Sequence, residues 1–335
     1  MLASHVAYGL RLTANLPIPG LPLRQDTQIT DVRVWLGERS HSPIQAASSL
    51  EFIYISPDCA EGEPRLRVAR DTSGQYFAFF YRDGARFVVE RHGREVWADW
   101  PQGYTLEDAC TYLLGPVMGF VLRLRGIICL HASAIVTGSG AIILAGPPGA
   151  GKSTLAAAFG RTGCPVLSDD VVALENGGER FFVRPGYPRL NLWPDSVRVL
   201  FGSEDVLPHI TPTWDKRYLA LGENGWHFAS EPSILRAIYI LGERESDMDG
   251  VIFEEVPGGE ALMALVANSY VNYLLDRDMR SREFVVLGSL IAGIPIRRIR
   301  LTTNPKDISS LCGAIAADAM RFSTVEEPLT TRHYH

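Results

Sequence analysis

The sequence predicts an α/β fold in which a β-rich α+β N-terminal domain precedes a P-loop domain. Short runs that alternate with period two, typical of half-buried strands, occupy residues 1 to about 103. A pair of aspartates lies about one helix and one turn beyond a glycine-rich motif. That motif fits the phosphate-binding pattern G-x-x-x-x-G-K-[ST] and reads Gly146-Pro147-Pro148-Gly149-Ala150-Gly151-Lys152-Ser153.

The N-terminal domain is predicted over residues 1–125. Alternating runs at 31–36, 65–69 and 86–90, with turn residues between such runs, indicate a sheet of hairpins. We expect the aromatic residues near its centre to form core rather than a binding platform: Phe77, Phe79, Phe80 and Tyr81. Thr105 is a candidate N-cap for a helix that runs to about Arg125 and ends at Gly126. No catalytic constellation is evident in this part of the sequence.

The catalytic domain is predicted over residues 126–322. A strand at 127–136, a turn at 137–140 and a buried strand at 141–145 lead into the glycine-rich motif, and a helix begins directly after it. Further along, we expect strands at 235–241 and 296–301, and helices at about 259–275, 282–292 and 304–320. Residues 323–335 are predicted to be a flexible tail.

The order of strand, loop and helix makes the glycine-rich motif a credible triphosphate site. We predict that ATP binds along residues Gly146 to Thr154, where backbone N–H groups and the helix N-terminus face the phosphates. The Lys152 ammonium is expected to reach the β- and γ-phosphates, and the Ser153 hydroxyl to ligate Mg²⁺.

The two aspartates, Asp169 and Asp170, follow Lys152 by 17 and 18 residues. A β-α-β unit of this length places them at the carboxyl end of a strand near the P-loop, where ligands gather in α/β sheets. One carboxylate can hold Mg²⁺ while the other accepts a proton from an attacking hydroxyl. Both can face the phosphates only if the strand ends there, because consecutive strand residues point in opposite directions. His131 either orients one of these aspartates or is structural.

Three further basic residues are candidate phosphate contacts: Arg189, Lys216 and Arg217. Arg189 interrupts an apolar stretch, and the other two follow a proline-rich loop that is a candidate substrate clamp. For Arg217 a solvated charge cluster is the simpler interpretation.

Composition limits the alternatives. The formal net charge of −6 over 335 residues is unlike the basic balance of dedicated nucleic-acid binders, so no nucleic-acid partner is expected. No apolar run reaches the roughly 20 residues that span a bilayer, and the first residues lack signal-peptide character, so no membrane association is expected. Five cysteines without C-x-x-C spacing fit reduced thiols, and we expect a cytoplasmic protein.

The combined motifs resemble the catalytic core of the HPr kinase/phosphorylase family. The resemblance is carried by Leu130-His131-Ala132-Ser133, the P-loop, and Val166-Leu167-Ser168-Asp169-Asp170, in this order and spacing. It implies a PEP-carboxykinase-like P-loop fold and ATP- and Mg²⁺-dependent phosphorylation of a serine hydroxyl in a peptide or protein. By position it implies that Asp169 is the general base, that His131 is the partner of this base, and that Asp170 beside it serves the metal. Members of the family form hexamers, so a homo-oligomer is one expectation.

The resemblance has departures. Tyr187-Pro188-Arg189-Leu190-Asn191-Leu192-Trp193-Pro194 stands where the family carries a Glu-rich motif, which leaves an additional metal carboxylate and a reverse phosphorylase activity open. The N-terminal region is more similar to a divergent branch, some of whose members phosphorylate the C-terminal serine of a lasso-peptide precursor. A precursor serine is therefore the favoured acceptor. An HPr-type carrier protein, hydrolysis of ATP without transfer, and a small-molecule acceptor remain as alternatives.

Overall fold

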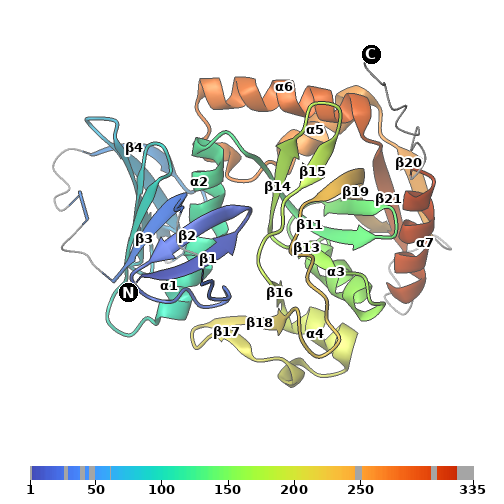
Figure 1. The fold of residues 1–335 in the computed structure, drawn as a ribbon, viewed down its shortest axis with the longest axis horizontal. Coiled ribbons are helices and arrows are strands. Elements are labelled where there is room, and N and C mark those ends of the chain that lie inside the picture. The colour runs from blue at the N-terminus through green and yellow to red at the C-terminus, as the bar shows by residue number, and fades with distance from the viewer. Residues whose placement is uncertain are drawn as a thin grey trace, which may run out of the picture.

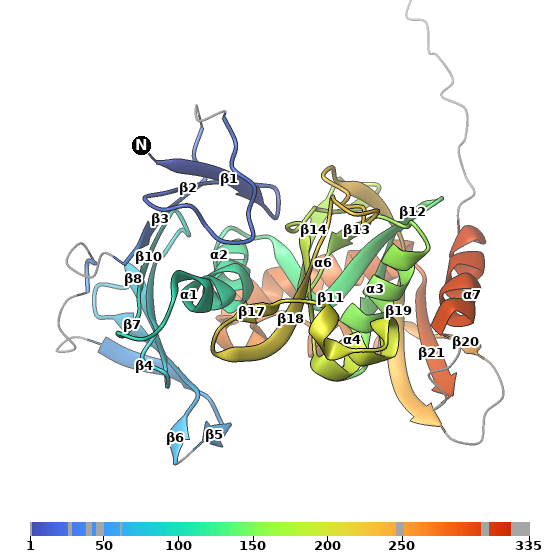
Figure 2. The ribbon, with the colours of Figure 1, turned by 90° about the horizontal axis from the view of Figure 1, so that it is seen from below.

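The computed structural model describes residues 2–25, 29–37, 42–44, 50–60, 62–245, 251–302 and 308–322. Within these residues the chain forms two eight-stranded sheets, a three-stranded sheet and a short hairpin. The two large sheets lie at opposite ends of the molecule, and the helices α1 (Leu106–Tyr112) and α2 (Met118–Leu124) lie between them (Figures 1 and 2). Among the described residues, no helix combines the length and apolar character that crossing a membrane requires.

The first sheet has the strand order β1-β2-β3-β10-β9-β8-β7-β4, with parallel pairs β2–β3 and β3–β10 and antiparallel pairs elsewhere. The strands predicted at 31–36, 65–69 and 86–90 are confirmed as β3, β7 and β9. The bounds in this sheet and its adjoining hairpin are β1 (Ala3–Ala7), β2 (Leu10–Ala14), β3 (Val32–Leu36), β4 (Leu50–Ile55), β5 (Cys59–Ala60), β6 (Glu63–Pro64), β7 (Leu66–Asp71), β8 (Tyr76–Tyr81), β9 (Arg86–Glu90) and β10 (Glu95–Asp99).

The helix predicted over 105–125 is present but interrupted. Thr105 caps α1 in a capping box with Asp108, as the sequence suggested for the N-cap. Between α1 and α2 lies a π-helical turn, η3 (Leu113–Val117), in which Gly115 leaves the helical region at φ −95°, ψ −107°. Pro116 follows directly, and its missing N–H accounts for the broken hydrogen-bond ladder. This turn brings the chain close to Asp170 and Tyr270.

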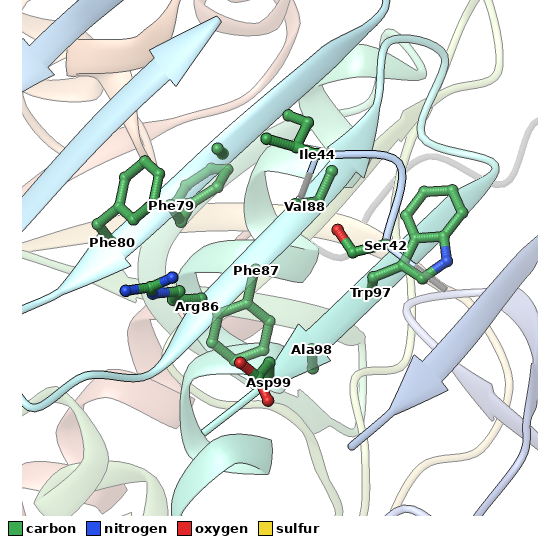
Figure 3. Close-up of a pocket in the computed structure, with 11 residues that line it drawn as sticks. Ser42, Ile44, Phe79, Phe80, Arg86, Phe87, Val88, Trp97, Ala98 and Asp99 are labelled. Carbon is green, nitrogen blue, oxygen red and sulfur yellow. The ribbon is translucent and has the colours of Figure 1, made fainter. Parts of the chain in front are cut away.

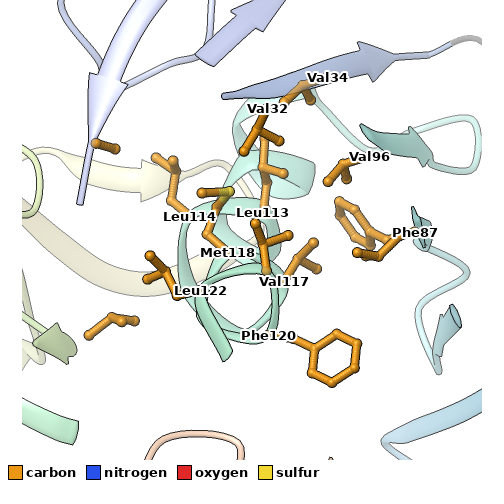
Figure 4. Packing of buried hydrophobic residues seen from close by; sticks show 14 of the residues in the cluster. Val32, Val34, Phe87, Val96, Leu113, Leu114, Val117, Met118, Phe120 and Leu122 are labelled. Carbon is orange, nitrogen blue, oxygen red and sulfur yellow. The ribbon is translucent and has the colours of Figure 1, made fainter. Parts of the chain in front are cut away.

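The apolar face of this helical segment packs on the first sheet (Figure 4). Phe120 makes edge contacts with Phe77 and Phe79, at ring centroid distances of 5.0 and 5.5 Å. The same cluster of buried side chains continues into residues beyond the predicted boundary at 125, including Val171 and Tyr270. The two parts therefore share a continuous apolar contact.

The second sheet has the order β12-β11-β14-β15-β19-β21-β20, with β13 paired to β11 and β12 paired to β19. Because β19 pairs with both β12 and β15, these strands close on themselves. The strand bounds are β11 (Ile128–Thr137), β12 (Gly140–Ala145), β13 (Val166–Ser168), β14 (Val171–Asn176), β15 (Phe181–Val183), β19 (Ser233–Glu245), β20 (Ile252–Glu255) and β21 (Ile296–Thr302). The helices beside them are α3 (Lys152–Arg161), α5 (Gly258–Ala267), α6 (Arg277–Gly293) and α7 (Ile308–Met320).

The prediction of one long helix at 259–275 is wrong. Helix α5 ends at Ala267, and a short 3-10 helix, η5 (Asn272–Leu274), follows a turn in which Val271 has φ +49°. A β-branched residue in this region is strained. Helix α6 begins earlier than predicted because the Asp276 side chain caps it through the Met279 N–H. The predicted start of the last helix at 304 and the tail 323–335 lie outside the described residues.

A third element covers the P-loop side of the second sheet. The small sheet β16-β18-β17 consists of β16 (Arg189–Leu192), β17 (His209–Thr211) and β18 (Trp214–Ala220). Helix α4 (Pro194–Phe201) and a 3-10 turn, η4 (Glu204–Val206), connect its strands. The core that α3 and α4 share with β16 and β18 includes Leu155, Leu190, Val197 and Leu219.

Candidate active site

A cavity of about 510 Å³ lies between the two large sheets and the small sheet. The P-loop and both aspartates form one end of it. Other lining residues come from the N-terminal part of the chain and include Leu66, Tyr81 and Tyr112. Pockets with a few converging polar groups between structural units are the usual place for ligands.

The P-loop joins β12 to α3, so the predicted order of strand, loop and helix is confirmed. Gly149 and Gly151 have φ values of +81° and +97°, which L side chains rarely adopt. A Cβ at Gly146 would lie 2.9 Å from the Leu241 carbonyl oxygen, so a side chain there would displace the neighbouring strand β19. The glycine positions thus reflect backbone demands of the loop.

The Lys152 side chain is folded back on the loop that carries it. Its Nζ donates to the carbonyl oxygens of Gly146 and Pro147, at 2.8 and 3.1 Å. The residue is only 7% exposed, and burial lowers the pKa of Lys152, which the charges of Asp170 and Asp169 partly oppose. The ammonium is thus bonded to two neutral carbonyl oxygens of the loop, and a bound phosphate would stabilise its positive charge further.

Asp169 is the buried member of the aspartate pair and lies against the P-loop serine. The Ser153 hydroxyl donates to Asp169 Oδ1 at 2.9 Å, and Ser133 Oγ donates to the same oxygen at 2.6 Å. The Asn191 N–H donates to Oδ2 at 3.3 Å. Burial raises the pKa of Asp169, although these hydrogen bonds act against the shift. A cation bound beside Asp169 would stabilise the ionised carboxylate and offset the effect of burial.

The Asp170 side chain has different neighbours from Asp169. Strand β13 ends at Ser168, and Asp170 takes φ +65° before β14 begins. The strand therefore ends at the pair, as predicted. Asp170 Oδ1 lies 3.1 Å from His131 Nδ1, and the Tyr270 hydroxyl donates to Oδ2 at 2.8 Å. Burial would raise the pKa of Asp170, but His131, Lys216 and Tyr270 together lower it to about 2.

The pairing of His131 differs from the expectation from the family resemblance, which joined His131 to Asp169. The structure places His131 beside Asp170 because β11 and β14 are antiparallel, with His131 opposite Val171, so that the imidazole reaches the residue before β14. Ser153 and Asp170 were likewise expected to hold the metal together, but the Ser153 hydroxyl bonds to Asp169 instead.

The groups around Ser153 suit a hard divalent cation. A hydroxyl and a carboxylate oxygen are adjacent there, and the buried side-chain oxygen of Asn191 has no hydrogen-bond partner. Oxygen ligands of this kind are those that Mg²⁺ takes together with phosphate oxygens and water. Ser153 and Asp169, with Asn191 nearby, are therefore the residues that fit the ion.

A short segment after α5 holds both halves of the site, and the sequence analysis missed it. Asn268 Oδ1 accepts a hydrogen bond from the Gly146 N–H at 2.9 Å, and its carbonyl accepts one from the His131 N–H at 2.7 Å. Two residues on, Tyr270 reaches Asp170. The available signal was the polar pair Asn268-Ser269, which interrupts the apolar pattern of the helix before it.

Ser269, between them, links the segment to the N-terminal helices. Its hydroxyl donates to Glu283 Oε1 at 2.5 Å, and Arg123 of α2 contacts the same oxygen at 2.5 Å. Both members of this ion pair are buried. A Cβ at Gly119 of α2 would lie 2.5 Å from the Tyr270 ring, so α2 passes directly over this tyrosine.

The three further phosphate candidates lie in different places. Lys216 lines the cavity and lies over the Trp193 ring, 4.9 Å from its centroid. Arg217 is buried and turned to His209, with a 3.0 Å contact between Nη1 and Nδ1. Arg189 stacks on Tyr218 at 4.0 Å and lines a separate surface pocket. The structure therefore brings only Lys216 of the three to the P-loop cavity.

A smaller cavity of about 50 Å³ lies on the outer side of the first sheet (Figure 3). Ser42 and Ile44 cover it above β8, β9 and β10. Arg86 and Asp99 are the charged side chains among its described lining residues. This arrangement pairs no nucleophile with a base.

Comparison with known proteins finds likenesses among solved structures. No family model matches the chain, and no curated protein matches it. A solved structure, the Hpr(Ser) kinase/phosphatase from Coxiella burnetii, aligns with 58% of this chain and 99% of its own, at 12% identity and a TM-score of 0.32. A likeness at this level carries no argument about the reaction.

Proposed function

We propose that this protein is an ATP- and Mg²⁺-dependent kinase that phosphorylates a serine hydroxyl of a peptide or protein. One observation carries the proposal: two adjacent carboxylates in one cavity have different partners. Asp169 accepts from the P-loop Ser153, and Asp170 lies between His131 and Tyr270. Phosphoryl transfer needs both a metal carboxylate and a base close to the phosphates.

The roles follow from these partners. The P-loop amides and Lys152 hold the triphosphate, and Ser153 and Asp169 hold Mg²⁺, which neutralises phosphate charge when bound. Asp170 accepts the proton of the acceptor hydroxyl as the new O–P bond forms and the bond to the ADP oxygen breaks. His131 and Tyr270 fix the direction of this carboxylate. Positioning and charge stabilisation supply most of the rate acceleration in such reactions.

The lowered pKa of Asp170 determines its charge state for this role. At neutral pH the carboxylate is ionised and ready to accept a proton, which passes to solvent after transfer. The Asp170 side chain is 38% exposed, so the cavity reaches it. Asp169, in contrast, is 6% exposed and is closed off beside Ser153.

In its narrowest form, which comes from the sequence resemblance, the acceptor is the C-terminal serine of a lasso-peptide precursor. The test is intact mass spectrometry of serine-ended precursor peptides after incubation with ATP, Mg²⁺ and the protein. Lys152→Ala and Asp170→Asn serve as inactive variants. A mass gain of one phosphate that both variants abolish supports the proposal. ATP consumption without any mass gain favours hydrolysis or another acceptor.

A further inference from the structure

The cavity has two chemically different ends. All of its charged side chains, and His131, lie at the P-loop end: Lys152, Asp169, Asp170 and Lys216. The described residues that line the other end carry no formal charge: Leu66, Tyr81, Thr111, Tyr112, Pro116, Ile210, Trp214 and Tyr273. We call this second set the aromatic wall.

The rings of the aromatic wall are fixed by one another. Tyr81 and Tyr112 stack with their ring centroids 3.9 Å apart, and Trp214 meets Tyr112 edge-on at 5.5 Å. The Tyr112 hydroxyl donates to Asp83, which sets the orientation of its ring. Tyr273 stacks on Tyr54 at 4.2 Å. The wall is thus a preformed, largely aromatic surface without formal charge, of the kind that binds ligands without much ordering cost.

Asp170 lies where the two ends meet. A Cβ at Gly115, on the turn between α1 and α2, would lie 3.5 Å from Asp170 Oδ2. Gly115 lines the cavity between Tyr112 and this carboxylate. A nucleotide seated on the P-loop therefore leaves the aromatic wall as the remaining surface from which an acceptor hydroxyl can approach the base.

Five of the wall residues come from the N-terminal part of the chain, where no catalytic constellation was evident in the sequence: Leu66, Tyr81, Thr111, Tyr112 and Pro116. Leu66 and Tyr81 belong to the first sheet, and Tyr112 ends α1. Tyr81, predicted to be core, is half-buried: it packs against the core of the first sheet and also lines the cavity, whereas Phe79 is fully buried. The N-terminal sheet therefore supplies part of the site.

We propose, resting on the kinase function above, that the aromatic wall binds the acceptor and selects a serine in a flexible peptide whose neighbouring residues are uncharged and apolar or aromatic. Burying a charged neighbour against this wall would leave it without a partner, which is costly. Aromatic and apolar neighbours gain stacking and burial there instead. A flexible segment can follow this wall and bring its serine to Asp170 inside the cavity.

The test uses acetylated and amidated pentapeptides with a central serine flanked on both sides by phenylalanine, leucine, aspartate or lysine. The full-length protein is assayed for phosphorylated peptide by mass spectrometry, with kcat/KM measured for each peptide. We expect the phenylalanine and leucine peptides to exceed both charged peptides by at least about tenfold, which corresponds to about 1.4 kcal/mol. Equal use of charged and apolar peptides overturns the inference.

Variants of the wall supply the second part of the test. Tyr112→Ala should lower kcat/KM for the phenylalanine peptide by about tenfold, with KM for ATP unchanged, while Tyr112→Phe, which keeps the ring and loses only the bond to Asp83, should lower it less. Trp214→Leu gives an independent variant if Tyr112→Ala fails to fold. Tyr76→Ala is the matched control, because Tyr76 contacts Trp97 on the first sheet and does not line the cavity.

The outcomes separate the two proposals. Phosphorylation of peptides that is indifferent to their flanks and to Tyr112→Ala contradicts the acceptor wall and leaves the kinase function standing. Failure of every peptide, with ATP consumption that depends on Lys152 still present, contradicts the peptide kinase function and the acceptor wall with it.

Discussion

Replacing Tyr270 by phenylalanine tests whether Asp170 is held for catalysis. The change removes one hydroxyl that donates to Asp170 Oδ2 at 2.8 Å and keeps the ring that packs against Gly119. A hydrogen bond to a charged group contributes about 1.5–3 kcal/mol. Because the Asp170 side chain is 38% exposed and His131 remains, water offsets part of the loss. We expect a net effect of about 1–1.4 kcal/mol, or a kcat lowered about fivefold to tenfold.

The pH profile of Tyr270→Phe gives the more specific result. The pKa of Asp170 is lowered to about 2 by His131, Lys216 and Tyr270, against the effect of burial. The ionised form is active, so activity is complete above this pKa and falls as pH drops through it. Loss of one donor raises the pKa, and the acidic limb of kcat should move to higher pH.

Steady-state kinetics between acidic and neutral pH, at saturating ATP, measure both effects. Tyr239→Phe is the matched control, because its buried hydroxyl donates to Asp318 at 3.0 Å, away from the cavity. An unchanged kcat and acidic limb for Tyr270→Phe would refute the positioning role. So would an equal fall for both variants, since that result would indicate a general loss of packing.

Three further predictions use other parts of the site. Gly119→Ala places a methyl group 2.5 Å from the Tyr270 ring, so kcat should fall at least as far as in Tyr270→Phe and the thermal midpoint should drop by several degrees, as followed by calorimetry. Lys216→Ala should weaken ATP binding severalfold in a fluorescent-nucleotide titration, whereas Arg217→Ala, which faces His209, should affect stability instead; the reverse pattern would contradict the placement. Asn268→Ala removes the acceptor of a P-loop N–H bond of 2.9 Å and should also weaken nucleotide binding, by about 1 kcal/mol, with the acidic limb of kcat unmoved.

Local sequence patterns were sufficient for much of the fold. The strand before the glycine-rich motif and the helix after it are set by neighbouring residues, and their prediction from sequence is confirmed. The capped start of α1 at Thr105 is likewise local. The break at Gly115 and Pro116 was missed because the apolar period continues through it, although a glycine next to a proline was the available signal.

Other features of the fold and the site depend on long-range contacts, which local sequence patterns do not reveal. Which aspartate meets His131 depends on the register of β11 against β14 and on the left-handed conformation of Asp170. Tyr270 is 100 residues from the carboxylate it contacts, and the end of α5 at Ala267 is set by contacts of Asn268 with the P-loop and β11. The contribution of Tyr81 to the cavity depends on how the first sheet packs against the P-loop part.

The division of work between the two aspartates is the central claim, and one measurement tests it directly. Affinity for a fluorescent ADP analogue is titrated with and without Mg²⁺ for wild type, Asp169→Asn and Asp170→Asn, and phosphoryl transfer is measured beside it. We predict that Asp169→Asn loses the Mg²⁺-dependent gain in affinity. Asp170→Asn should keep that gain and lose phosphoryl transfer. If Asp170→Asn instead loses the Mg²⁺ effect while Asp169→Asn keeps it, the assignment drawn from Ser153 and His131 is wrong.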